Sequence, residues 1–78
     1  MKPMVTEKAV MMIEAQNVLS FKTEKNMTKE EIKKEVEEIF EVKVSSVRTR
    51  IKGNNKYAYV KLKPEFLAID IATKLGII

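Results

Sequence analysis

Apolar and polar residues alternate strictly in two short segments of the chain, residues 47–52 and 57–63, on either side of Gly53, Asn54 and Asn55. A period of two indicates a strand that buries one face, and two such strands around a short polar break are typical of a hairpin. In the first segment, valine, threonine and isoleucine fall on one face, and two arginines and a lysine fall on the other. The pattern therefore predicts a hairpin with one apolar face and one cationic face.

Asn54 and Asn55 are predicted to form the turn of this hairpin, because asparagine tolerates the positive φ that two-residue hairpin turns need. This turn sets the expected cross-strand pairs, which are Ile51 with Ala58, Thr49 with Val60, Val47 with Leu62, Arg48 with Lys61, Arg50 with Tyr59 and Lys52 with Tyr57. The inward-facing positions change from even to odd residue numbers between Val44 and Val47. This change predicts a bulge or a helix-to-strand corner at Ser45 and Ser46.

Two helices are predicted before the hairpin. Thr6 is expected to cap the first, which ends at Asn17, and its predicted inner side consists of Ala9, Met12, Ile13 and Gln16. Thr28 and Glu31 have the spacing of a capping box and open the second helix. Its predicted inner side consists of Ile32, Val36, Ile39 and Phe40.

A third helix is predicted after the hairpin, opened by Pro64 and Glu65. Gly76 fits the left-handed position that ends a helix, and Ile77 is placed to pack back on its last turn, as in a Schellman motif. The predicted inner side of this helix consists of Ala68, Ile71, Ala72 and Leu75. A further strand is expected over residues 18–23, with Leu19 and Phe21 inward and Ser20 and Lys22 outward.

These elements predict an α+β fold in which an antiparallel sheet of three to four strands is packed with helices. The expected order is helix, strand, helix, strand, strand, helix. The 78 residues are expected to form a single domain, residues 1–78. The sequence has no cysteine and no long apolar run, so we expect a cytoplasmic protein without disulfides and without direct membrane insertion.

Charge is distributed unevenly along the chain. The formal net charge is +4, but residues 43–63 hold seven lysines and arginines and no acid, whereas residues 30–41 hold six of the eleven acids. Cations interleaved with tyrosines on a strand face suit a phosphate backbone and exposed bases. The alternative is the solvated face of a half-buried sheet, but such faces usually mix both signs.

Catalytic chemistry is not expected from this composition. The chain has no histidine, no cysteine and only two, widely separated glycines, so it lacks the common nucleophiles, the usual transition-metal ligands and a phosphate-cradling glycine loop. The acids of residues 30–41 alternate with lysines, and we interpret them as a solvated helix face rather than a divalent-metal site. We therefore expect a binding protein with no cofactor and no metal.

The ordered blocks at residues 5–9, 17–21, 28–44, 47–49, 57–62, 68–72 and 75–77 resemble the family of large-subunit ribosomal protein L twenty-three over nearly the whole chain. The short turn at Gly53 is similar to the archaeal form, because bacterial relatives carry a long hairpin extension there. The family usually has asparagine at the position of Arg48 and lysine at the position of Tyr57.

The resemblance implies a structural protein of the ribosome that binds large-subunit ribosomal RNA beside the exit of the nascent-peptide tunnel. Its implied partners are neighbouring ribosomal proteins, the signal recognition particle, the translocation channel and the nascent chain. Glu7 is the implied protein-docking residue, and its alternative role is that of an anion in the first turn of a helix. The expected RNA-binding residues are Lys2, Thr6, Lys8, Arg48, Arg50, Lys52, Asn54, Asn55, Lys56, Tyr57, Tyr59, Lys61 and Lys63.

Two other functions remain open from the residues alone. Residues 57–60 match the centre of the RNP1 pattern of RNA-recognition motifs, although Lys56 replaces a glycine and Leu62 replaces an aromatic residue of that pattern. A protein-interaction adaptor is the other alternative, with either the acidic helix or the methionines of the first helix as its binding face. We interpret those methionines as gap-filling core.

Overall fold

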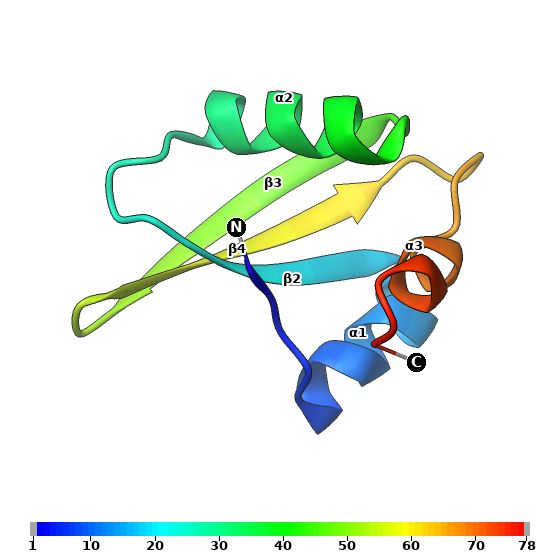
Figure 1. Ribbon diagram of the computed structural model, residues 1–78, viewed down its shortest axis with the longest axis horizontal. Helices are drawn as coiled ribbons and strands as arrows, with labels where there is room; N and C mark the ends of the chain where they lie inside the picture. The colour runs from blue at the N-terminus through cyan, green and yellow to red at the C-terminus, as the bar shows by residue number, and fades with distance from the viewer. Residues whose placement is uncertain (1, 78) are drawn as a thin grey trace.

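Four antiparallel strands form one sheet, and helices lie against both of its faces (Figure 1). The computed structural model describes residues 2–77. The strands are β1 (Lys2–Pro3), β2 (Val18–Thr23), β3 (Val44–Lys52) and β4 (Asn55–Leu62), and the helices are α1 (Glu7–Gln16), α2 (Lys29–Phe40) and α3 (Ala68–Lys74). The strand order is β1-β2-β4-β3. The predicted α+β class and element order are confirmed, with the short edge strand β1 added at the front.

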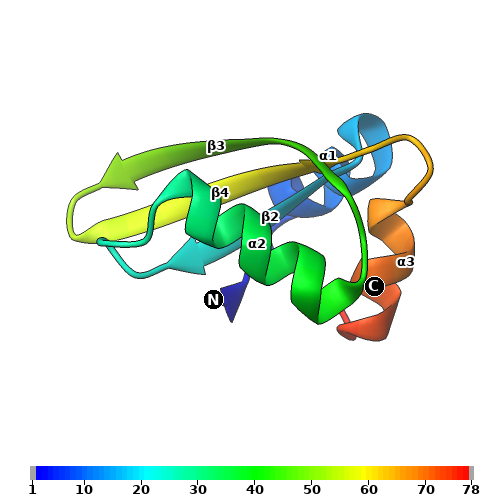
Figure 2. The same ribbon diagram turned by 90° about the horizontal axis from the view of Figure 1, so that it is seen from above.

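The helices divide between the two sides of the sheet. Figure 2 shows α2 across one face, with α1 on the far side of the strands and α3 beside one end of them. The face under α2 is apolar: Phe21 of β2 stacks on Phe40 of α2 with ring centroids 6.2 Å apart, and Ala58 and Val60 of β4 are fully buried. The core therefore lies between the sheet and α2, and it extends to α3 through Ala68 and its buried neighbours.

The hairpin turn differs from the prediction by its position. Lys52 pairs with Asn55, so Gly53 and Asn54 are the two turn residues, and Gly53 has a φ of 63°. Glycine adopts positive φ with no steric cost and is favoured at the first turn position, so it takes the place that we predicted for an asparagine.

This turn shifts the hairpin register by two residues from the one we predicted. The observed pairs are Val47 with Val60, Arg48 with Tyr59, Thr49 with Ala58, Arg50 with Tyr57, Ile51 with Lys56 and Lys52 with Asn55. A shift of two keeps every side chain on its predicted face.

Most of the other local signals are confirmed. The register shift between Val44 and Ser46 is the predicted bulge. The Thr6 hydroxyl accepts a hydrogen bond from the Ala9 amide at 3.0 Å, and both bonds of the capping box that starts at Thr28 are formed. Both helices begin at these residues because a side-chain oxygen accepts a hydrogen bond from a backbone amide that has no partner inside the helix.

The end of α3 is a Schellman motif, as predicted. The Gly76 amide donates to the Thr73 carbonyl and the Ile77 amide donates to the Ala72 carbonyl, while Gly76 has a φ of 76°. Ile77 is half-buried against the core. Leu75, predicted as an inner residue, is instead 37% exposed, because the chain reverses at Gly76 and brings Ile77 inward in its place.

Asn17 joins α1, β4 and α3. Its backbone has the left-handed conformation that ends α1. Its side chain accepts a hydrogen bond from the Ala68 amide at 2.6 Å and donates to the carbonyls of Phe66 at 2.8 Å and Leu62 at 3.4 Å. The third helix was predicted to open at Pro64 but begins at Ala68, because residue 67 is a leucine without a capping group and the cap comes from Asn17.

Other side chains also differ in exposure from the prediction. Ile39 is 58% exposed because the buried stripe of α2 is narrow and follows Ile32 and Val36. Gln16 is exposed because it lies at the last residue of α1, beyond the buried pair of that helix. Met11 is 63% exposed and is no part of the core.

Ser20 points outward as predicted but is buried. It lies on the face opposite Leu19 and Phe21, and it lines a small cavity together with residues of α1. The second face of the sheet is therefore partly covered, which the alternation in β2 does not reveal.

Replacing Asn17 by glycine is expected to lower the free energy of unfolding by about 2 kcal/mol, because the left-handed backbone is kept and only the side-chain hydrogen bonds are lost. Asn17→Ala should lower it by roughly 1 kcal/mol more, since alanine is strained at this φ. Urea denaturation of the two variants measures both effects. A glycine variant as stable as the original protein would contradict the role assigned to this side chain.

Candidate nucleic-acid interface

The face of the sheet that lies away from α2 carries a row of three cations and one tyrosine across the four strands. Cross-strand pairing places Lys2 beside Lys22, Lys22 beside Tyr57, and Tyr57 beside Arg50. A second row runs from Ser20 through Tyr59 to Arg48. Directly paired residues share a face, so strands that are distant in sequence contribute to one cationic surface.

A groove runs along this surface between α1 and the hairpin. Three adjoining cavities of about 310, 240 and 50 Å³ share Lys8 and Tyr59 among their lining residues. We call this groove the cationic groove and define it by eight of the residues that line the two larger cavities. They are Met4, Lys8, Met12, Arg48, Arg50, Lys52, Tyr57 and Tyr59.

The groove has one sign of charge. Lys8 is supplied by α1, and Arg48, Arg50 and Lys52 are supplied by β3, while the described residues that line the three cavities include no carboxylate. All four cations are exposed. A concave surface lined by charges of one sign concentrates the electrostatic potential and attracts counter-ions. The geometry therefore favours a polyanion as the bound molecule.

Tyr59 lies in the floor of the cationic groove. It is half-buried, it pairs with Ser20 and Arg48 on its two neighbouring strands, and it lines all three cavities. The ring is thus neither fully covered by α1 nor open to solvent. An aromatic ring held in this way offers apolar area while the cations beside it stay in water.

The structure brings only part of the predicted RNA-binding set together. Lys8, Arg48, Arg50, Lys52, Tyr57 and Tyr59 lie in the cationic groove, Thr6 lines its smallest cavity, and Lys2 extends it at the edge strand. Asn54 lies in the hairpin turn, and Asn55 is the first residue of β4 after it.

Three predicted residues lie elsewhere. Lys56 shares the face of Ala58 and its ammonium donates a hydrogen bond to the Met27 carbonyl before α2. Lys61 lies near the end of β4 opposite the turn, and Lys63 follows that strand.

Sequence reasoning did not include Lys22 or Met12 in this site. The alternation in β2 predicted that Lys22 points outward, but its position beside Tyr57 depends on the pairing of β2 with β4. Met12 is supplied by α1, whose position over the sheet has no local signal.

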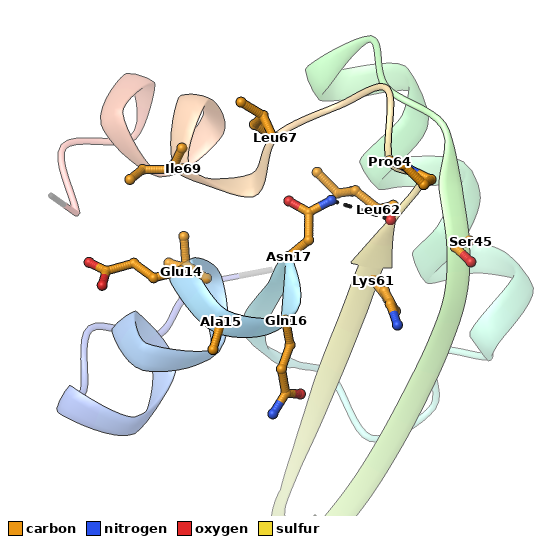
Figure 3. A pocket seen from close by; sticks show the side chains of 11 residues that line it. Glu14, Ala15, Gln16, Asn17, Ser45, Lys61, Leu62, Pro64, Leu67 and Ile69 are labelled. Carbon is orange, nitrogen blue, oxygen red and sulfur yellow. Dashed lines mark hydrogen bonds between the residues drawn. The ribbon is translucent and has the colours of Figure 1, made fainter.

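Another cavity, of about 860 Å³, lies away from the cationic groove (Figure 3). It is bounded by the end of α1, the start of α3 and the neighbouring ends of β3 and β4, and Figure 3 shows Asn17 bonded to Leu62 at its centre. Its lining holds one cation, Lys61, and one acid, Glu14. These charges balance, so this cavity does not favour a polyanion.

Residues 2–77 contain neither a metal-binding cluster nor a helix that could span a membrane. No group of three or more acidic, histidine or cysteine side chains is arranged to hold a metal ion. None of the helices in this range has the length and hydropathy needed to cross a membrane.

The chain matches a known protein family. The family model described as Ribosomal protein L23 matches residues 1–67 of the 78-residue chain. The match spans α1, α2 and the complete hairpin. It therefore includes every residue of the cationic groove.

Ser20 beneath the groove gives a test of this geometry. Its hydroxyl is buried and has no hydrogen-bond partner among the described residues, so Ser20→Ala is expected to raise the free energy of unfolding by about 1 kcal/mol. Ser46→Ala, at an exposed serine of β3, is the control and should change it by less than about 0.5 kcal/mol. Both are measured by urea denaturation, and a loss of stability in Ser20→Ala would show that the hydroxyl is satisfied.

Proposed function

Because this chain belongs to the family of ribosomal protein L23, we propose that its cationic groove binds large-subunit ribosomal RNA. The single observation that carries this proposal is the acid-free set of cations, drawn from α1 and β3, around a half-buried tyrosine. Sheet pairing fixes the spacing of these charges, so they are arranged before any RNA arrives.

Family membership makes the protein a structural constituent of the large ribosomal subunit, located in the ribosome in the cytoplasm and associated with ribosomal RNA and other ribosomal proteins. Ribosomal proteins of this kind are structural rather than enzymatic. The chemistry required of the site is therefore recognition, without a covalent step.

The proposed mechanism is neutralisation of phosphates by cations that are held in position. Lys8, Arg48 and Arg50 displace counter-ions condensed on the RNA backbone, and this displacement supplies affinity that falls as salt rises. Phosphate contacts fix the orientation of a protein on a nucleic acid but carry no sequence information directly. The groove would accordingly read the shape of a folded RNA.

The two alternative functions have less support. A recognition-motif protein stacks several bases along the open face of its sheet, but here α1 lies beside the face that carries Tyr59 and leaves only a small cavity. Within residues 2–77 no strand follows α3. An adaptor that binds through methionines would use Met11, which is exposed. The family match favours neither alternative.

We also propose that the protein forms part of the docking platform at the tunnel exit, with Glu7 as the contact for the signal recognition particle. The translocation channel, neighbouring ribosomal proteins and the nascent chain are the other proposed partners. Glu7 is exposed in the first turn of α1, so a partner can reach it. The two-residue turn at Gly53 supports the archaeal type, because the hairpin has no extension for the tunnel interior.

The double variant Arg48→Ala, Arg50→Ala is expected to bind a folded large-subunit ribosomal RNA fragment about 10- to 100-fold more weakly, because two charge-assisted contacts are lost. The slope of log affinity against log salt concentration should become shallower by about 1.5. Filter binding across a salt series measures both quantities.

The matched control for this pair is Lys33→Ala, Lys34→Ala. It removes the same amount of charge from exposed positions of α2, on the other side of the sheet. Affinity and slope should stay within about twofold of the original protein. If both double variants lose affinity equally, net charge rather than the cationic groove accounts for RNA binding.

Replacing Glu7 by lysine is expected to weaken binding of the signal recognition particle to ribosomes that carry the variant by about tenfold, because an attractive contact becomes repulsive. Co-sedimentation of the particle with reconstituted ribosomes measures the change. Glu24→Lys, an exposed acid outside α1, is the control with the same change of charge. Equal binding by both variants and the original would remove Glu7 from the platform.

A further inference from the structure

The cavity with the largest volume of the three in the cationic groove combines a cationic rim with an apolar floor. It has a volume of about 310 Å³ and is lined by Lys8 and Met12 of α1, Arg48, Thr49 and Arg50 of β3, and Tyr59 of β4. Met12 and Tyr59 are half-buried, whereas the three cations are exposed. Phosphate neutralisation requires the cations alone, so the floor has no role in the proposed phosphate contacts.

A regular RNA helix cannot use such a floor. Its bases are stacked and paired, and it presents phosphates and sugars to a protein. An unpaired base that leaves the helix presents a flat apolar face, which stacks on aromatic rings or on arginine planes. The volume of this cavity is at the lower end of the range for small-ligand sites, which suits one base rather than a longer single strand.

We propose that this cavity accepts one extruded, unpaired base of the bound RNA. The base lies against Tyr59 and Met12, and Lys8, Arg48 and Arg50 hold the phosphates on either side of it. This inference rests on the proposed binding of ribosomal RNA and adds the feature that the protein selects, which is a bulged nucleotide within a helical segment.

The position of Tyr59 in the sheet supports this assignment. Its cross-strand neighbours are Arg48 and Ser20, so a cation flanks the ring on one side and a small residue flanks it on the other. Met12 approaches the same cavity from α1, and its flexible thioether adapts to a flat partner. The floor therefore offers contact from the sheet and from the helix.

The test compares two RNA hairpins that are identical except for one added nucleotide. In the first, a 2-aminopurine is bulged and unpaired, and in the second an added uridine opposite it forms a base pair with it. The original protein is expected to bind the bulged hairpin about tenfold more tightly, because one base is stacked. The fluorescence of the unpaired 2-aminopurine should decrease on binding. Equal affinities, or unchanged fluorescence, would overturn the inference.

Matched methionine variants separate the floor from the rim. Met12→Ala should reduce the preference for the bulged hairpin to less than about threefold, with an unchanged salt slope because all cations remain. Met11→Ala changes the neighbouring residue of α1, which is exposed and lines none of the three cavities, and should keep the tenfold preference. Loss of preference in both variants, or in neither, would count against the cavity.

Tyr59→Leu gives a second test of the floor and should also reduce the preference, with folding checked by circular dichroism. If this variant does not fold, Met12→Ala still decides the result. The Arg48→Ala, Arg50→Ala variant distinguishes the two proposals. If this variant binds both hairpins more weakly and the original protein has no preference for the bulged hairpin, only the proposal of an extruded base is refuted. Binding of both hairpins that does not depend on these arginines refutes the RNA-binding groove itself.

Discussion

The pairing of β4 with β2 on one side and β3 on the other is the constraint on which the rest of the structure depends. It places Ala58, Val60 and Leu62 in the core, where each is at most 1% exposed, and it places Tyr57 and Tyr59 on the opposite face. A slip of one residue would exchange these two sets. The pairing that buries the core therefore also positions the cations of β2 and β3 in register beside the tyrosines.

Asn17 connects this sheet to the groove. Its left-handed backbone ends α1 and leads directly into β2, while its side chain fixes the start of α3. The direction in which α1 leaves the sheet is therefore restricted at one residue. Because Lys8 and Met12 both belong to α1, this junction helps to determine where one wall of the cationic groove stands.

The sequence predicted the face of the sheet on which a side chain lies better than it predicted the neighbours of that side chain. Arg50 was expected opposite Tyr59 and lies opposite Tyr57, yet both tyrosines remain on the cationic face because the register shift is even. Lys56 has the same parity as Ala58, so its place on the apolar face was readable from the alternation. The place of Met12 in the cationic groove and the burial of Ser20 could not be predicted, because both depend on how α1 packs over residues distant in sequence.

The cationic face of the sheet also has a thermodynamic consequence for so small a protein. Lys2 and Lys22 lie directly opposite each other on neighbouring strands, and like charges in that position are destabilising. A chain of this size has a core that rarely contributes more than roughly 3–5 kcal/mol of net stability, so repulsion on one face is a significant fraction of the total. A bound polyanion relieves the repulsion and stabilises the folded state by mass action. Under the proposed function, the same side chains lower the stability of the free protein and raise its affinity for RNA.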